Sequence, residues 1–131
     1  MPREPLHIRH VNLARGFRGG ERQTLLLIQA LARIDDERGS IEQSLVCRRD
    51  SPMRAALADT DIELIDADHA LAGHAHRPRA SLTHAHEAKA VHWAWVERHL
   101  RGTPYILTRR VPQPVKDKRF NRWTYRGAAT A

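Results

Sequence analysis

The sequence predicts an α/β fold in which a parallel sheet of about five strands has helices on both faces. Two observations predict it. Short apolar segments alternate along the chain with segments of helical periodicity, which is typical of a parallel sheet built with right-handed crossovers. The 131 residues, of which 41% are hydrophobic, suffice for one folded domain with a single core and are too few for two.

The first two elements follow from the spacing of apolar side chains. Residues 6–13 place Leu6 and Ile8, together with His10, on one face and are expected to form a strand. Residues 21–39 are expected to form a helix that closes with a glycine. The apolar side chains that recur at helical spacing in this helix are Leu25, Leu26, Ile28, Leu31, Ala32 and Ile34.

The middle of the chain predicts two further strands around a short helix. Residues 43–49 and 62–68 are short apolar strand candidates. Between them, Ser51 is a favourable N-cap and Pro52 suits the first helical position. A helix is therefore expected over 51–60.

The last predicted elements are two strands and a helix. Residues 69–79 contain a glycine and a proline and are expected to be a loop or a broken helix. Residues 80–87 predict a fourth strand, 88–102 a helix, and 103–111 a fifth strand. The expected packing positions of the helix are Val91, Trp95, Val96 and Leu100.

Two unusual segments are expected to meet at one edge of this sheet. In the common doubly wound order, strands one and four are neighbours and the chain leaves them in opposite directions, which opens a ligand-binding crevice between their carboxyl ends. The segment GFRGGER, residues 16–22, follows the first strand, and HAHE, residues 84–87, ends the fourth. Their convergence is the best evidence for a site in the residues themselves.

The glycine-rich segment has two interpretations. Glycines let backbone N–H groups approach an anion, and the N-terminus of the following helix adds a partial positive charge. The segment lacks both the Gly-x-Gly-x-x-Gly spacing and the P-loop ending. The second predicted strand ends in Arg48 and Arg49, which could suit a 2′-phosphate but leave no acid placed to bind a ribose, so a nicotinamide enzyme is disfavoured. The alternative is an ordinary turn between a strand and a helix.

The nine histidines include two His-x-His pairs, at 74–76 and 84–86. Such a pair in an extended chain can chelate a metal ion, and Glu87 is available as a third ligand, so a metal-dependent hydrolase is one hypothesis. No Cys-x-x-Cys motif accompanies the pairs, and we predict no metal site. A histidine at the carboxyl end of a strand is better placed as a general base or a hydrogen-bond donor to a ligand.

The formal net charge of +7 indicates an anionic partner, which could be nucleic acid, phospholipid headgroups or a phosphorylated substrate. Five of the cations lie among the aromatic side chains of residues 112–131, a pattern that suits a membrane-interface helix, a surface for nucleobases or a solvated charged face. No stretch is apolar enough for a signal peptide or a membrane span, and Cys47 has no cysteine partner. We therefore expect a cytoplasmic protein.

Three segments of the chain resemble one family. The segments HVNLARGFRGGERQTLLLIQAL, LVCRRDSP and THAHEAKAVHWAWVERHLRGTPYILTRR are similar to the N-terminal half of the retaining glycosyltransferases of family 4. These enzymes have the GT-B architecture of two Rossmann-like domains. The resemblance covers residues 6–126 and is closest to bacterial members that build lipopolysaccharide core or related cell-envelope glycans. The Gly-Gly turn and the His-x-His pair are specific to it in combination.

The resemblance implies a sugar-nucleotide donor substrate, a glycan or lipid acceptor, and no cofactor. It places the catalytic position at His86, beside the transferred sugar, with His84 as the fallback. It implies substrate contacts, near the donor diphosphate or the acceptor, for Gly19, Gly20, Glu21, His84, Arg109 and Arg110. It also implies peripheral contact with the inner face of the cytoplasmic membrane through Lys116, Lys118, Arg119, Arg122 and Trp123.

Two departures from the family pattern shape the expected organisation. Residues 1–111 are expected to be the Rossmann-like domain and 112–131 its basic amphipathic extension. The C-terminal domain that grips the nucleotide in such enzymes is missing, so we expect a truncated, acceptor-side domain that is inactive on its own. The region between strands three and four is also less regular than in the family. The alternative interpretation is a small basic nucleic-acid-binding module.

Overall fold

The computed structural model confirms the α/β fold. It describes residues 6–16, 19–38, 41–67, 74 and 79–108, and in these ranges the chain forms one sheet of five parallel strands and three helices. The strands are β1 (Leu6–Asn12), β2 (Ile41–Cys47), β3 (Glu63–Asp66), β4 (Leu82–Ala85) and β5 (Tyr105–Leu107). The helices are α1 (Gly19–Arg38), α2 (Pro52–Ala56) and α3 (Ala88–Arg101).

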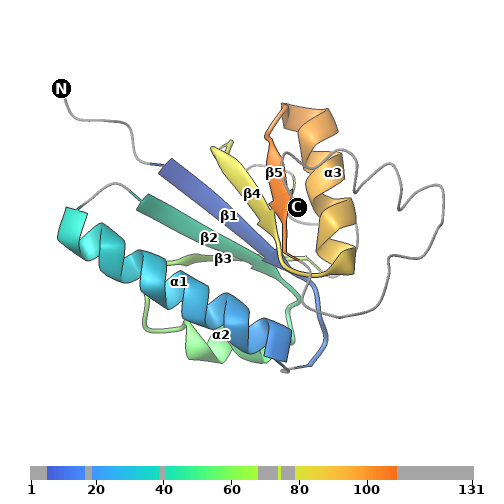
Figure 1. Cartoon of the computed structure of the whole chain (residues 1–131). Coiled ribbons are helices and arrows are strands. Elements are labelled where there is room, and N and C mark those ends of the chain that lie inside the picture. Colours follow the sequence, from blue (N-terminus) through green and yellow to red (C-terminus); the bar gives the residue numbers. More distant parts are fainter. Residues whose placement is uncertain (1–5, 17–18, 39–40, 68–73, 75–78, 109–131) are drawn as a thin grey trace.

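The strand order β3-β2-β1-β4-β5 is that of a Rossmann-like sheet (Figure 1). The central strand β1 is paired with β2 on one side and with β4 on the other. After β1 the chain crosses to β2 through α1, and after β4 it crosses to β5 through α3. The predicted adjacency of the first and fourth strands is therefore confirmed, and the chain leaves them in opposite directions.

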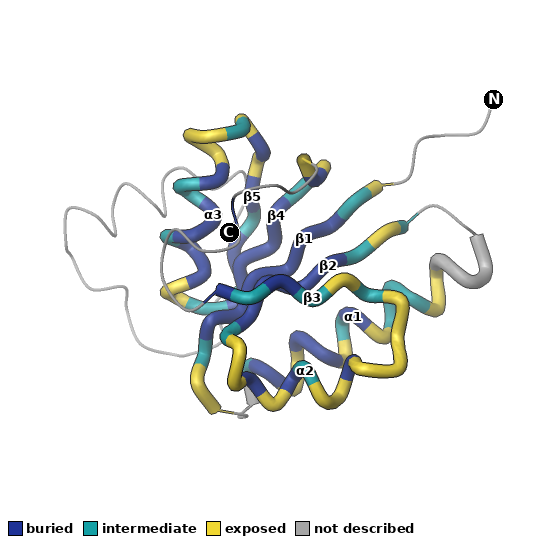
Figure 2. The backbone as a smooth tube through the Cα atoms, turned by 180° about the vertical axis from the view of Figure 1, so that it is seen from behind, coloured by how far each residue is buried: buried dark blue, intermediate teal, exposed yellow. Residues whose placement is uncertain are grey.

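The helices cover the two faces of the sheet, with α1 and α2 on one side and α3 on the other (Figure 1). Each face has its own buried apolar cluster. Leu45 of β2 packs with Leu25 and Ile28 of α1, whereas its neighbour Val46 packs with Trp93 of α3. Figure 2 shows that burial is greatest along the central strands. This alternation of side chains along one strand is what lets a single sheet serve two cores.

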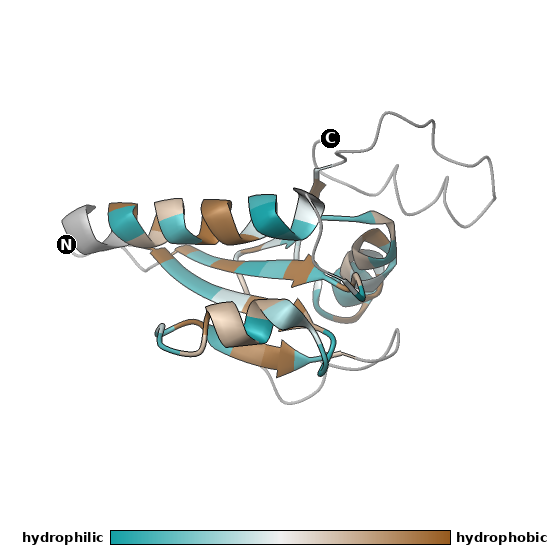
Figure 3. Ribbon diagram, turned by 90° about the horizontal axis from the view of Figure 1, so that it is seen from below, coloured by the Kyte–Doolittle hydropathy of each residue, from teal (hydrophilic) through white to brown (hydrophobic). Residues whose placement is uncertain are grey.

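Helix α1 packs along a narrower stripe than the sequence predicts. Leu25 and Ile28 are buried, but Leu26 and Ile34 are 48% and 43% exposed. Figure 3 shows that hydrophilic and hydrophobic residues alternate along the length of this helix. The six apolar positions are spread too widely around the helix for all of them to face β2 at once. None of the described helices is long and apolar enough to cross a membrane.

Helix α3 corrects the predicted packing face. Leu100 is 63% exposed and Trp95 and Val96 are only partly buried, whereas Trp93 is fully buried. The buried residues of the helix are Ala90, Val91, Trp93, Ala94 and Glu97. The helix ends at Gly102, whose φ of 73° is the left-handed conformation that glycine adopts without strain.

Candidate functional site

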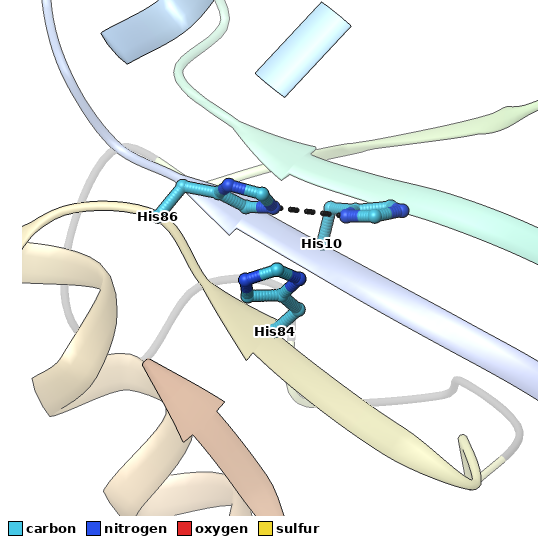
Figure 4. Close-up of side chains that lie close together, drawn as sticks. All are labelled: His10, His84 and His86. Carbon is cyan, nitrogen blue, oxygen red and sulfur yellow. Dashed lines mark hydrogen bonds between the residues drawn. The ribbon is translucent and has the colours of Figure 1, made fainter. Parts of the chain in front are cut away.

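The pairing of β1 with β4 gathers three histidines on one face of the sheet. His10 of β1 lies directly beside His84 of β4 in the parallel register. His86 is two residues beyond His84, and because side chains alternate along a strand it projects to the same side. The three imidazoles, which we call the histidine cluster, therefore come from β1, from β4 and from the residue that directly follows β4 (Figure 4).

The rings of the histidine cluster touch one another. Nδ1 of His10 lies 2.9 Å from Nε2 of His86, within hydrogen-bond distance, and the rings of His84 and His86 stack with their centroids 4.0 Å apart. One ring nitrogen from each residue can be chosen so that all three nitrogens lie within 4.8 Å of one another. All three residues are buried. Within the described part of the chain, this is the one group of histidine, cysteine or acidic side chains close enough to share a metal ion.

Two polar side chains outside the cluster orient its rings. Oε1 of Gln43 lies 2.8 Å from Nε2 of His10, and the amide nitrogen of Gln43 donates a hydrogen bond to the carbonyl oxygen of Ile28 in α1. On the other strand, Oγ1 of Thr108 lies 2.7 Å from Nε2 of His84. Gln43 therefore links the cluster to α1, and Thr108 links it to the end of β5.

Burial keeps His10 in its neutral form. Loss of contact with water lowers its pKa to about 4; the hydrogen bond with Gln43 opposes this shift and nearby His84 adds to it. Because Oε1 of Gln43 is an acceptor, the neutral ring has its proton on Nε2 and a lone pair on Nδ1. That lone pair points at His86.

Glu87 is not a ligand of this cluster. Its carboxylate caps α3 by accepting hydrogen bonds from the backbone N–H groups of Lys89 and Ala90, and it accepts a third from Leu13 at 2.8 Å. Burial raises the pKa of Glu87, and these three bonds act in the opposite direction. The sequence-based hypothesis of a His84, His86 and Glu87 metal set is therefore wrong in its third member, because capping uses both carboxylate oxygens.

The glycine-rich segment follows β1, as predicted, but Gly19 and Gly20, which we call the glycine turn, are the first residues of α1 instead of a loop before the helix. Helix α1 begins at Gly19, and a Cβ atom added to Gly20 would meet nothing within 4 Å, so packing does not require glycine there. Asn12 fixes the turn because its side-chain amide donates to Oγ1 of Thr24, whose hydroxyl donates to the carbonyl oxygen of Gly20. Glu21 is buried in the first turn of the helix.

The remaining predicted site residues lie outside the described residues. They are Arg109 and Arg110, together with the proposed membrane contacts Lys116, Lys118, Arg119, Arg122 and Trp123. The structure thus brings together His84 and His86 and places the glycine turn at the same edge of the sheet.

Sequence reasoning missed the role of His10. It placed His10 on the same face as Leu6 and Ile8 and gave it no function. The signal that would have found it is the combination of two inferences already made, the pairing of strands one and four and the alternation of side chains along each. The sequence does not determine the register between the two strands. In the structure this register places His10 beside His84.

A second buried polar group has a structural explanation. His74 stacks on Trp93 with ring centroids 4.0 Å apart, and its Nδ1 pairs with the carboxylate of Glu97. Arg101 donates to the carbonyl oxygen of His74 at 2.6 Å. All three partners belong to α3, so these contacts hold His74 against that helix.

A groove of about 360 Å³ lies away from the carboxyl edge of β1 and β4. It is bordered by α1, by Ile41 and Glu42 at the amino end of β2, and by the segment between α2 and β3. It contains none of the predicted site residues. Gln43, the partner of His10, is part of its lining.

Comparison with known proteins adds no identification: no family model, curated protein or solved structure matches the chain. Function must be inferred from the site and from the sequence motifs.

Proposed function

We propose that the chain is the acceptor-side domain of a glycosyltransferase that uses a sugar-nucleotide donor and a cell-envelope glycan or lipid acceptor. The observation that supports this most is the position of the glycine turn and His86 at the same edge of the β1–β4 pair. That edge is where Rossmann-like sheets bind their ligands. The motifs at these two positions are those in which the sequence resembles the family.

The glycine turn supplies the anion-binding part of the proposal. The first turn of a helix has backbone N–H groups without partners inside the helix, and the helix dipole adds positive charge to them. Gly20 leaves open space where a Cβ would stand, so a phosphate group can approach the backbone closely. Stabilisation of a leaving diphosphate by such fixed dipoles is how an enzyme favours cleavage of the bond to a nucleotide.

In the proposal, the histidine cluster forms the wall that lies opposite the glycine turn. His86 lies directly after β4, and its contacts with His10 and His84 fix the orientation of its ring before any substrate binds. In the proposed function this wall lies beside the transferred sugar. Preorganised polar groups of this kind do not need to be reoriented during the reaction.

The first experiment tests anion binding at the glycine turn. The ¹⁵N-labelled chain is titrated with UDP-glucose, GDP-mannose and inorganic pyrophosphate while the backbone amide resonances are followed by NMR. We expect the amides of Gly19, Gly20 and Glu21 to shift with at least one nucleotide sugar. The Gly20→Ala variant should bind about tenfold more weakly, because its methyl group occupies the approach path.

Gly16→Ala is the matched control, since its added Cβ also meets nothing within 4 Å. It should retain the affinity of the original chain. Equal affinity in both variants, or no shift at the first turn of α1 with millimolar ligand, would overturn the proposal. Sugar transfer by the isolated chain would contradict the part of the proposal that assigns it only the acceptor side.

The composition of residues 112–131 supports peripheral contact with the membrane that carries the acceptor. Their cations and aromatic side chains suit the interface of an anionic bilayer. The chain should sediment with vesicles containing 30% phosphatidylglycerol and be released by 0.5 M salt. Retention on a short oligonucleotide but not on these vesicles would favour the nucleic-acid-binding alternative instead.

A further inference from the structure

We propose that His10, His84 and His86 form a binding site for a divalent transition-metal ion, with Zn²⁺ as the most suitable, that fastens β1 to β4. The inference goes beyond the proposed glycosyltransferase function and does not depend on it. It starts from the placement of three imidazoles on one face of two paired strands, with a nitrogen from each within 4.8 Å of the others.

The distances are close to those of a metal site. Zinc binds histidine nitrogen at about 2.0–2.1 Å, so two nitrogens in a tetrahedral site lie about 3.4 Å apart. His10 Nδ1 and His86 Nε2 are 2.9 Å apart and would have to separate by about 0.5 Å. The other pairs, at no more than 4.8 Å, would have to approach by at most about 1.5 Å, which small rotations of the rings can supply.

The surroundings of His10 are those of a metal ligand. A histidine that binds a metal through one nitrogen almost always donates its other N–H to an oxygen acceptor, which fixes the tautomer. Oε1 of Gln43 is that acceptor, and the bond from the Gln43 amide to Ile28 keeps the oxygen turned toward His10. The lone pair of His10 Nδ1 is therefore already aimed at Nε2 of His86, another member of the cluster. On metal binding, Nε2 of His86 gives up the proton that it shares with His10 and Nδ1 of His86 takes one up from solvent, so both rings stay neutral.

The donor set selects the class of metal. Three imidazoles favour zinc, nickel or copper over magnesium and calcium, which prefer oxygen ligands. Within the described residues no carboxylate joins the set, since Glu87 is engaged in capping α3. Three histidines are also the number of protein ligands found at zinc sites that take a fourth ligand from solvent or substrate.

The experiment uses the full chain without a histidine tag, freed of metal by EDTA and then dialysed. Co²⁺ is titrated as a spectroscopic probe, and Zn²⁺ is measured by displacement. We expect one ion per chain, the visible absorption bands of four- or five-coordinate Co²⁺, and a higher unfolding temperature with Zn²⁺.

Variants locate the ion. His10→Gln, His84→Gln and His86→Gln should each weaken Zn²⁺ binding at least tenfold. Gln43→Leu should weaken it about tenfold by removing the acceptor that orients His10. His99→Gln and His76→Gln are the matched controls, and both should bind Zn²⁺ as the original chain does. The first removes an exposed histidine of α3, and the second breaks the His-x-His pair at 74–76.

Two results would overturn the proposal. One is a Zn²⁺ dissociation constant above 100 μM for the original chain. The other is binding that His10→Gln leaves unchanged or that His76→Gln abolishes, either of which assigns the ion elsewhere. Because a variant can fail to fold, the imidazole ¹⁵N resonances of the original chain give an independent test: Zn²⁺ should shift His10 Nδ1 and leave both nitrogens of His99 unmoved. Failure of this test would not affect the glycan-transfer proposal, whose readout is the glycine turn.

Discussion

The carboxylate of Glu87 accepts a hydrogen bond from the backbone N–H of Leu13, 2.8 Å away. The same carboxylate caps the first turn of α3. One side chain thus joins the end of β1 to the start of the helix that follows β4, at the edge of the sheet where the proposed site lies.

Removal of this carboxylate should destabilise the fold. Glu87→Ala leaves three backbone N–H groups without their acceptor, and we expect the free energy of unfolding in urea to fall by about 2 kcal/mol. Lys89→Ala, at an exposed position of the same helical turn, should change it by less than about 0.5 kcal/mol. If Glu87→Ala lowers the free energy of unfolding by no more than Lys89→Ala does, the cap does not stabilise the fold as proposed.

Trp93 should contribute far more to stability than the other large side chains of α3. It is fully buried and stacked on His74, whereas Leu100 is 63% exposed. Trp93→Ala should lower the free energy of unfolding by about 3–5 kcal/mol, the usual cost of removing a buried aromatic ring. Leu100→Ala should cost less than about 0.5 kcal/mol. A large loss at Leu100 would support the packing face predicted from the sequence instead.

The two glycines at helix ends should respond oppositely to alanine. Gly102 has a φ of 73°, so Gly102→Ala should lower stability by about 1–2 kcal/mol through backbone strain alone, since the nearest atom to its Cβ is 3.9 Å away. Gly20 is helical with open space around it, so Gly20→Ala should raise stability by up to about 1 kcal/mol. Thermal unfolding of both variants checks this. A destabilised Gly20→Ala chain would mean that the turn needs glycine for folding.

The metal-free protein should lose stability as the pH falls below 6.5. Burial lowers the pKa of His7, His10 and His92, and that of His10 to about 4. The unfolded chain therefore takes up protons that the folded chain does not, and the stability contributed by neutral His10 is present above pH 6.5 and lost toward pH 4. Urea unfolding between pH 7.5 and 4 should show that His10→Gln removes about 2–3 kcal/mol of this loss. Parallel curves for the two proteins would contradict the assignment.

The arrangement of the fold could be predicted because its signals are local. Ser51 and Pro52 define the start of α2, and the alternation of apolar strands with helices defines a parallel sheet. The packing face of α3 was harder to predict. Its apolar side chains lie all around the helix, and the choice between Trp93 and Trp95 depends on the position of β1 and β5 beneath it.

The candidate site could be predicted only in part. The carboxyl edge of β1 and β4 was found from topology, together with His84 and His86. The third histidine depended on a register between strands that lie far apart in the sequence, and the role of Glu87 depended on where the first turn of α3 begins. Both are set by tertiary packing that short-range patterns do not contain.

The pairing of β1 with β4 also has a kinetic consequence. His10 and His84 are 74 positions apart, and everything between them must fold back before the two strands can meet. Such long-range parallel contacts form late and slowly, because the entropy of closing a long loop is lost before the contacts compensate for it. The β2–β1–α1 unit can assemble earlier, since its parts are contiguous. We therefore expect the histidine cluster to be completed late in folding, after the strand and helix that carry the glycine turn have paired.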